Sequence, residues 1–527
     1  MSKSPKFSPG THANVCLLLE GTFPYVRGGV SSWVKQLIEG MPELTFSIVF
    51  LGGKADEYDN PAYDIPPNVV HIENHFLIGS DKEPSTKKKF WKRKADKAAL
   101  FDRNTQLHNM LSDTENQIGS EVARDFTNLL SNENGICRTD LFHSDEAWES
   151  IREKYLEAPP GLDFNHYFWT VRTMHSPLFT LANIAKNPPS ADLYHSVSTG
   201  YAGYLGAMLK SKTGAPYVIS EHGIYTKERE IDLAHVDWIP EEVDPYRVGL
   251  DDSMSYLRQT WIRFFQSLGR MSYSSADQIY TLYNGNRERQ IADGAPVDKL
   301  TIVPNGVDVA KLSQIRRDSD APIPPVLALI GRIVPIKDIK TFIRGMRIIC
   351  AQVPHAEGWL VGPEDEDPDY VKECKALVKS FGLENSVKFM GFQKLEQIFP
   401  KIGLTVLTSV SEGQPLTTLE GFAAGIPAIT TDVGSCSDLL YGNTEEDKSL
   451  GQAGAIVPIS NPRLFAEAAL LLLMDPDKWR EARDAAIARV EQYYDAQDML
   501  SHYRAIYTDN ITRSIEDQQQ FKQAGGF

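Results

Sequence analysis

Cysteine is scarce in this 527-residue sequence, and no pair of cysteines has the spacing of a metal or redox motif. The chain holds five, an odd number at wide spacing with no C-x-x-C, so neither a disulfide framework nor a structural zinc site is predicted. This usage favours a reducing compartment. A long apolar run is also missing, since the longest, 468–474, is far shorter than the ~20 residues of a membrane span. We therefore expect a cytoplasmic protein.

The chain also lacks a basic charge balance and the glycine motifs of the common nucleotide-binding folds. Its 54 Lys and Arg against 70 Asp and Glu give a formal net charge of −16, which argues against a dedicated nucleic-acid binder. The G-x-x-x-x-G-K-[ST] motif of P-loop NTPases is absent. The glycine-containing stretch 21–29 does not spell G-x-G-x-x-G, so a nicotinamide cofactor is disfavoured.

What the sequence does contain is a regular alternation of predicted strands and helices. Apolar runs at 15–19 and 46–51 predict buried strands, and residues 31–41 between them have helical spacing. A strand, a glycine-containing loop, a helix and a second strand form the start of a βαβ unit with a parallel sheet. A second set of alternating strands and helices begins at 326–330 and runs to 428–430. Two successive sets predict an α/β fold with two doubly wound, Rossmann-like domains.

Composition indicates where these domains meet. The stretch 318–325 contains three prolines and predicts a boundary between an N-terminal domain, 1–317, and a C-terminal domain, 318–495. Between about 79 and 163 the alternation lapses, and this polar, charged segment predicts a largely helical insertion in the first domain. The last segment, 496–527, predicts one polar helix that packs back on the N-terminal domain.

Charged residues gather at two predicted strand ends in the second domain. Arg332 and Lys337 follow one strand, at the edge where open α/β sheets bind ligands, and together they could hold a diphosphate. Glu412 and Glu420 lie on either side of a helix start predicted at Pro415. Helix N-termini suit phosphate, whereas a carboxylate nearby can accept hydrogen bonds from the hydroxyls of a ribose or a sugar. Ordinary solvated cations and carboxylates remain the alternative for all four.

Two weaker candidates lie in the first domain. Gly28 and Gly29 follow the first predicted strand, where glycine permits close approach of the backbone to a ligand but is also typical of a plain tight turn. His222, preceded by Glu221, follows the predicted strand 216–219 and could hydrogen-bond a substrate. A lone histidine is more often structural, and the same ambiguity holds for Glu221.

Three motifs of the C-terminal half occur together: Gly331-Arg332 with Lys337, Glu412 with Glu420 eight residues later, and V-P-N-G-V-D at 303–308. In combination they resemble the retaining glycosyltransferases of family 4. The stretches 18–25, 28–34 and 220–225 are similar to a narrower group, the cytosolic glycosyltransferases of exopolysaccharide synthesis. Gly223 stands where many family members have an aspartate.

The resemblance implies a fold, an activity and partners. The fold would be GT-B, with two Rossmann-like domains facing a cleft. The enzyme would be a hexosyltransferase that moves a hexose or N-acetylhexosamine from a UDP-sugar to a growing exopolysaccharide and retains the anomeric configuration. It would need no cofactor and no metal. Its further partners would be exopolysaccharide synthesis and export proteins of the inner membrane, which would hold it peripherally at that membrane.

The resemblance also implies roles for individual residues. Arg332 and Lys337 would hold the donor diphosphate, Glu420 the ribose and Glu412 the transferred sugar. His222 would contact the sugar and completes an implied catalytic set with Arg332, Lys337 and Glu412. Gly391 and Phe392 would lie at the base, and backbone groups of 413–417 would donate to the donor. The full implied donor-binding set is Gly28, Gly29, Arg332, Lys337, Gly391, Phe392, Glu412, Gly413, Gln414, Pro415, Leu416, Thr417 and Glu420.

Other interpretations remain open. A non-catalytic nucleotide-sugar-binding scaffold would share the fold, and a nicotinamide-dependent sugar-nucleotide oxidoreductase or epimerase is the less favoured alternative. Asp365-Glu366-Asp367 has a metal-like D-x-D spacing, but a solvated acidic loop is favoured because two cations can neutralise a diphosphate. The basic run 87–94 with its two aromatics predicts either a solvated helix face or docking on an anionic surface.

Overall fold

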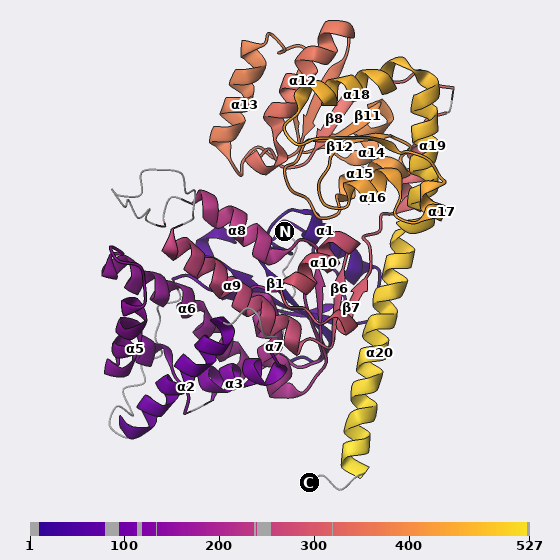
Figure 1. Ribbon diagram of the computed structural model, residues 1–527. Helices are drawn as coiled ribbons and strands as arrows, with labels where there is room; N and C mark the ends of the chain where they lie inside the picture. The colour runs from indigo at the N-terminus through magenta and orange to yellow at the C-terminus, as the bar shows by residue number, and fades with distance from the viewer. Residues whose placement is uncertain are drawn as a thin grey trace. The chain divides into compact units, whose positions relative to one another are not determined.

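The computed structural model describes residues 10–79, 94–112, 118–132, 134–236, 239, 255–318 and 320–523. The chain divides into two compact units. Unit 1 comprises the residues up to Ile302 together with those from Tyr503 onward, and unit 2 comprises Val303–His502. Each unit contains one parallel sheet with helices packed against it (Figure 1).

The sheet of unit 1 has, among the described residues, seven strands in the order β3-β2-β1-β4-β5-β6-β7. All neighbours pair in parallel. Strand β2 is buried along its whole length, as expected for an apolar run covered on both faces. The strands are β1 (Ala13–Glu20), β2 (Phe46–Gly52), β3 (Val69–Phe76), β4 (Ala191–Ser196), β5 (Tyr217–Glu221), β6 (Gln278–Thr281) and β7 (Leu300–Ile302).

Helices of unit 1 fall into a sheet-covering set and an inserted set (Figure 1). The first comprises α1 (Gly29–Glu39), α7 (Tyr201–Thr213), α8 (Tyr225–His235), α9 (Tyr256–Ser275) and α10 (Asn284–Ala292). The described part of the segment between β3 and β4 is helical and comprises α2 (Lys94–Ser112), α3 (Ser120–Ser131), α4 (Arg138–His143), α5 (Asp145–Leu156) and α6 (Phe164–Lys186). The helical segment is longer than the insertion expected to end near residue 163, because α6 follows that position. The C-terminal half of α6 packs in the core of unit 1 through Leu178, Leu181 and Ala185.

Unit 2 repeats the same plan. Its described residues form six parallel strands in the order β10-β9-β8-β11-β12-β13. The strands are β8 (Val326–Ile330), β9 (Glu357–Val361), β10 (Val387–Gly391), β11 (Leu404–Leu407), β12 (Ala428–Thr431) and β13 (Gly454–Val457). The helices are α11 (Val309–Leu312), α12 (Ile339–Gln352), α13 (Pro368–Ser380), α14 (Leu395–Ile398), α15 (Leu416–Ala423), α16 (Cys436–Tyr441), α17 (Glu445–Lys448), α18 (Pro462–Met474) and α19 (Pro476–Tyr493).

The order of strands reverses once in each sheet, between β1 and β4 in unit 1 and between β8 and β11 in unit 2. Ligands of open α/β sheets bind in the crevice at such a switch point, beyond the carboxyl ends of the strands. The prediction of two doubly wound, Rossmann-like domains is therefore confirmed. In the part of the chain that the structure describes, no helix has the length and apolarity to cross a membrane.

Unit 2 starts at Val303, earlier than the boundary expected at 318. Val307, Val309 and Leu312 pack with Phe422 and Val490 in its core, so the segment before the proline-rich stretch belongs to unit 2. Near the other end of the chain, helix α20 runs from Ala496 to Gln523. From Tyr503 onward it belongs to unit 1.

Candidate functional site

A glycine contact shapes the loop after β8. The φ angles of Gly331 and Gly362 are 157° and 155°, and a Cβ on Gly362 would lie 1.9 Å from the Gly331 carbonyl oxygen. Side chains are therefore excluded at this contact, which brings together the loops that follow β8 and β9. Arg332 comes next, and its Nη1 lies 2.5 Å from Glu366 Oε1 in the acidic loop. Both side chains are close to half exposed.

Lys337 ends the same loop and pairs with a different acid. Its Nζ forms an ion pair with Glu412, and Ser409 Oγ donates to the same carboxylate oxygen at 2.6 Å. The Lys337 and Glu412 side chains are only 20% and 15% exposed. A backbone bond of 2.9 Å from Val410 N–H to the Ile336 carbonyl joins the two loops. The structure thus brings Lys337 and Glu412 together at the switch point between β8 and β11, while Arg332 pairs separately.

Helix α15 follows the β11 loop and begins at Leu416, with Pro415 as its N-cap. The predicted start at Pro415 was one residue early, because the φ and ψ of Pro415 are extended rather than helical. Gln414 is 7% exposed, and its Oε1 accepts a hydrogen bond from the Asn305 backbone N–H at 2.6 Å. Its side chain therefore fixes the loop. The N–H groups of the first turn, including those of Leu416 and Thr417, lack helical acceptors and suit an anion.

Glu420 lies partly buried within α15, near the charged side chains of Glu396 and Lys311. Burial, together with the charge of Glu396, raises the pKa of Glu420 to about 7, and Lys311 opposes the shift. Lys311 Nζ and Glu396 Oε1 are themselves paired at 2.5 Å. A carboxylate in such a place gains strongly from hydroxyl donors, because they replace the lost hydration.

An exposed aromatic ends β10. Gly391 closes the strand with a φ of 61°, a left-handed conformation that favours glycine, and its carbonyl accepts from Gly362 N–H at 3.0 Å. Phe392 follows and is 66% exposed. Gly391 and Phe392 thus lie at the carboxyl edge of the same sheet as Lys337 and Glu412, on the strand next to β9.

Gly28 and Gly29 lie at the switch point of unit 1, at the start of α1. Gly28 is the N-cap, with extended backbone that any residue adopts, and a Cβ there would meet nothing within 4 Å. Its N–H donates to Tyr63 Oη at 3.3 Å, and Gly29 is exposed. Gly28 therefore has open space beside the first turn of α1, as close approach of a ligand requires.

His222 follows β5 and is 9% exposed. Its ring lies edge to face with Trp33 of α1, with centroids 4.4 Å apart. Burial lowers the pKa of His222 to about 4, so the imidazole is neutral near pH 7. Its Nε2 is buried and has no hydrogen-bond partner among the described residues. A buried nitrogen without a partner is costly, which favours a ligand contact over a structural role.

Glu221, the neighbour of His222, is a scaffold residue. Its carboxylate accepts hydrogen bonds from Tyr225 N–H, Thr199 Oγ1, Tyr273 Oη and Gln290 Nε2, at distances between 2.5 and 3.0 Å. Four donors satisfy the charge inside the core. The sequence left Glu221 ambiguous because its donors are distant in the chain.

The sequence analysis missed Glu20, the last residue of β1. Its carboxylate accepts from Tyr225 Oη at 2.7 Å and from the Ala202 N–H at the start of α7 at 3.2 Å. Glu20 thereby joins both sides of the switch point in unit 1. The one available signal was an acidic residue that ends an apolar strand.

The acidic loop after β9 is engaged by protein groups. Asp367 caps α13 by accepting from Tyr370 N–H at 3.0 Å, and Glu364 pairs with Lys375 at 2.5 Å. Glu366 holds Arg332, as described above. Across the described ranges, no three His, Cys, Asp or Glu side chains are arranged to hold a metal ion.

Two family models match the chain. Residues 13–298 match the family described as a domain of unknown function (DUF3492), and residues 324–475 match the family described as glycosyl transferases group 1. The second match contains Arg332, Lys337, Glu412 and Glu420, and the first contains His222.

Curated relatives include a D-inositol 3-phosphate glycosyltransferase of Nocardia farcinica, 26% identical over 41% of this chain and 50% of its own length. Another is the lipopolysaccharide core biosynthesis mannosyltransferase LpsB of Rhizobium meliloti, 24% identical over 39% of this chain and 60% of its own. The chain thus spans about half the length of such relatives.

Solved structures share the fold over most of the chain. Anabaena Alr3699/HepE in complex with UDP and glucose has a TM-score of 0.57 at 14% identity, covering 94% of this chain and all of that one. A sucrose-phosphate synthase from Thermosynechococcus elongatus has a TM-score of 0.56 at 16% identity, covering 95% and 100%. The two Rossmann-like domains are those of the GT-B fold. The chain belongs to the DUF3492 family and carries a glycosyl transferases group 1 domain.

Proposed function

We propose that the protein is a retaining hexosyltransferase of family 4 that moves a hexose or N-acetylhexosamine from a UDP-sugar to a growing exopolysaccharide. The observation that carries the proposal is the arrangement at the switch point of unit 2. There Lys337 pairs with Glu412, and the helix that follows the Glu412 loop carries the partly buried Glu420. Structures of similar fold, such as that of Anabaena Alr3699/HepE, hold UDP, which supports a UDP-sugar donor.

The donor roles follow from the chemistry of each group. Lys337 offers a partly buried ammonium and Arg332 a planar guanidinium for the diphosphate. The first-turn N–H groups of α15 add donors to the same anion. Glu420 accepts the two ribose hydroxyls, and Phe392, exposed at the end of β10, stacks on the base.

Glu412 takes part in both halves of the donor. Its carboxylate pairs with Lys337 and accepts a hydrogen bond from Ser409. When the diphosphate pairs with Lys337, the Glu412 carboxylate loses this partner and can accept hydrogen bonds from the hydroxyls of the transferred sugar. The cations then stabilise the leaving diphosphate as negative charge develops on it, so catalysis rests on electrostatics and positioning, without a metal.

The acceptor side is assigned to unit 1. His222 Nε2, neutral and without a partner in the described structure, accepts a hydrogen bond from a sugar hydroxyl. Gly28 and Gly29 let the ligand approach α1. The sequence resemblance of 18–25, 28–34 and 220–225 supports the narrower proposal that the protein has the role of PelF in Pel exopolysaccharide biosynthesis. Recruitment to inner-membrane export proteins belongs to that narrower proposal.

Purified protein tests the proposal with a panel of UDP- and GDP-sugars. Calorimetry measures donor binding, release of UDP measures turnover, and NMR of a transfer product reports whether the anomeric configuration is retained. Lys337→Ala should abolish turnover. Lys340→Ala, which removes an exposed lysine paired with Glu373 on the same segment, serves as the matched control. Binding of a UDP-sugar without turnover in any acceptor mixture would instead favour a nucleotide-sugar-binding scaffold.

A further inference from the structure

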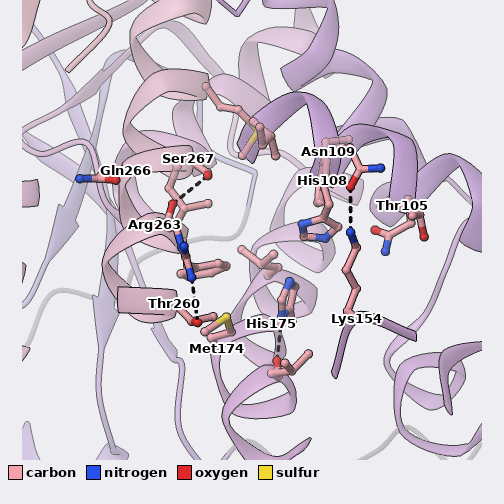
Figure 2. Close-up of a pocket in the computed structure, with 18 of the residues that line it drawn as sticks. Thr105, His108, Asn109, Lys154, Met174, His175, Thr260, Arg263, Gln266 and Ser267 are labelled. Carbon is pink, nitrogen blue, oxygen red and sulfur yellow. Dashed lines mark hydrogen bonds between the residues drawn. The ribbon is translucent and has the colours of Figure 1, made fainter. Parts of the chain in front are cut away.

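Unit 1 contains a cavity of about 790 Å³ that no step of the proposed reaction uses. Residues of α2, α5, α6 and α9 line it, and none of the described lining residues belongs to the candidate site. Its volume lies within the range of about 300–1,000 Å³ of small-molecule pockets. Figure 2 shows His108 and His175 in its middle, between Arg263 on one side and Lys154 with Asn109 on the other.

The two histidines face each other as neutral rings. Their centroids are 5.2 Å apart at an interplanar angle of 65°. Burial lowers the pKa of His108 to about 3 and also lowers that of His175. His175 Nδ1 lies 2.7 Å from the Val171 carbonyl oxygen, which only accepts, so this nitrogen carries the hydrogen. His175 Nε2 is therefore an acceptor, to which a ligand hydroxyl or N–H can donate.

The charges along the lining are unevenly compensated. Lys154 donates to Asn109 Oδ1 at 3.1 Å and to Glu157 Oε2 at 3.0 Å, so its charge is neutralised within the protein. Arg263, in contrast, is an exposed side chain at the edge of the lining and has no carboxylate partner among the described residues. Its Nη2 donates only weakly to Thr260 Oγ1 at 3.4 Å, and its guanidinium lies 5.5 Å from the centre of the Tyr256 ring. The Arg263 side of the cavity thus favours an anion.

The His175 ring packs against α9, the helix that carries Arg263, and apolar side chains form a large part of the remaining lining. The His175 ring lies 5.5 Å from the ring of Phe264, the residue next to Arg263 on α9. Buried side chains of Phe101, Phe126, Leu130 and Met271 line the remaining space. A cavity with apolar surface between polar groups on two sides can take an amphiphile.

We propose that this cavity binds a single-chain anionic lipid whose head group also carries a hydroxyl. Arg263 binds the anion, His175 Nε2 accepts the hydroxyl hydrogen, and the hydrocarbon chain lies against the apolar lining. A free fatty acid has the negative charge and the hydrocarbon chain but no hydroxyl. Comparing it with a hydroxyl-bearing anionic lipid therefore tests the proposed contact to His175.

Displacement of a fluorescent fatty acid from the full chain, below micelle-forming concentrations, tests the assignment. We use 1-oleoyl-lysophosphatidate, oleate, uncharged monoolein and glycerol 3-phosphate as competitors. Lysophosphatidate should bind at least tenfold more tightly than oleate, and glycerol 3-phosphate should not compete. Tighter binding of monoolein than of lysophosphatidate, or no displacement by either, overturns the proposal.

Variants assign the two polar contacts. Arg263→Gln should lower the affinity for both anionic lipids at least tenfold and leave the affinity for monoolein unchanged. Arg152→Gln, an exposed arginine of α5 that pairs with Glu149, is the matched control. His175→Phe keeps an aromatic ring but removes the acceptor. The variant should bind lysophosphatidate no more tightly than oleate. Thermal unfolding with and without lipid checks that each variant is folded, and equal affinities of the Arg263 and Arg152 variants contradict the site.

Discussion

Replacing Glu420 with Gln tests both the burial and the proposed role of this carboxylate. Burial and the Glu396 charge raise the pKa of Glu420 from 4.5 to about 7. Above pH 7 the folded protein therefore holds an ionised group in an environment that favours the neutral form. The difference between these pKa values corresponds to about 3 kcal/mol of lost stability.

The sign of the effect follows from proton binding. Between pH 4.5 and 7 the folded protein keeps a proton at Glu420 that the unfolded chain has lost, so the free energy of unfolding falls as pH rises. Below this window both states carry the proton, and Glu420→Gln should match the wild type. At pH 8 the Gln variant should be more stable by up to about 3 kcal/mol in urea unfolding. Glu481→Gln, at an exposed carboxylate of α19, should show no such pH-dependent gain.

The same substitution should harm donor binding. A carboxylate that accepts ribose hydroxyls contributes about 1.5–3 kcal/mol more than an unpaired group, so Glu420→Gln should weaken UDP binding about 10- to 100-fold at pH 8. Wild-type affinity should rise with pH through about 7 and level off above it, as Glu420 becomes ionised. The Gln variant, measured by calorimetry over the same pH range, shows how the titration of UDP itself affects binding. This contribution is subtracted from the wild-type data. Equal stability of both proteins at pH 8, or equal UDP affinity, would refute the reasoning.

Three further predictions concern charge. Arg332→Ala and Lys337→Ala should each weaken UDP binding, Lys337→Ala more strongly because its side chain is less exposed and less screened, and an unchanged affinity in the double variant would contradict the diphosphate assignment. UDP-sugar turnover should survive EDTA, and its loss with recovery on adding Mg²⁺ or Mn²⁺ would show that a metal is required. Exchanging the six basic residues of 87–94, of which only Lys94 is among the described residues, for Gln should leave donor hydrolysis intact and reduce co-sedimentation with anionic membranes, at about 1 kcal/mol for each charge. Equal recovery in the pellet would indicate a solvated face.

Much of the fold could be predicted because its strands are continuous apolar runs. The runs at 15–19, 46–51 and 326–330 lie within β1, β2 and β8, and the alternation with helices sets a parallel, doubly wound topology. Strand ends then locate the loops that carry Arg332 and Glu412. The proline-rich stretch 318–325 was less informative about the domain boundary. Proline indicates an irregular segment but does not indicate whether the residues before it pack in the first or the second core.

The rest of the candidate site depends on contacts between residues distant in the chain. Nothing near Gln414 indicates that Asn305 engages its side chain, and nothing near Arg332 indicates its pairing with Glu366. The free Nε2 of His222 is likewise a property of the packed core, set by Trp33 and the elements around it. Such partners are fixed by tertiary packing, which periodicity and spacing do not encode.

Two tyrosines in the N-terminal half of α20 complete the interior of unit 1, which affects when that unit can finish folding. Tyr507 Oη is hydrogen-bonded to His195 Nδ1 at 2.7 Å, and Tyr503 Oη to Ser220 Oγ at 2.8 Å, while the Tyr503 ring lies 5.1 Å from that of Trp33. All of unit 2, Val303–His502, is synthesised before these tyrosines. At about 5–20 residues per second, its 200 residues take roughly 10–40 s. The hydroxyl partners that α20 gives to His195 and Ser220 are therefore synthesised only after the whole of unit 2, so these contacts of unit 1 form last.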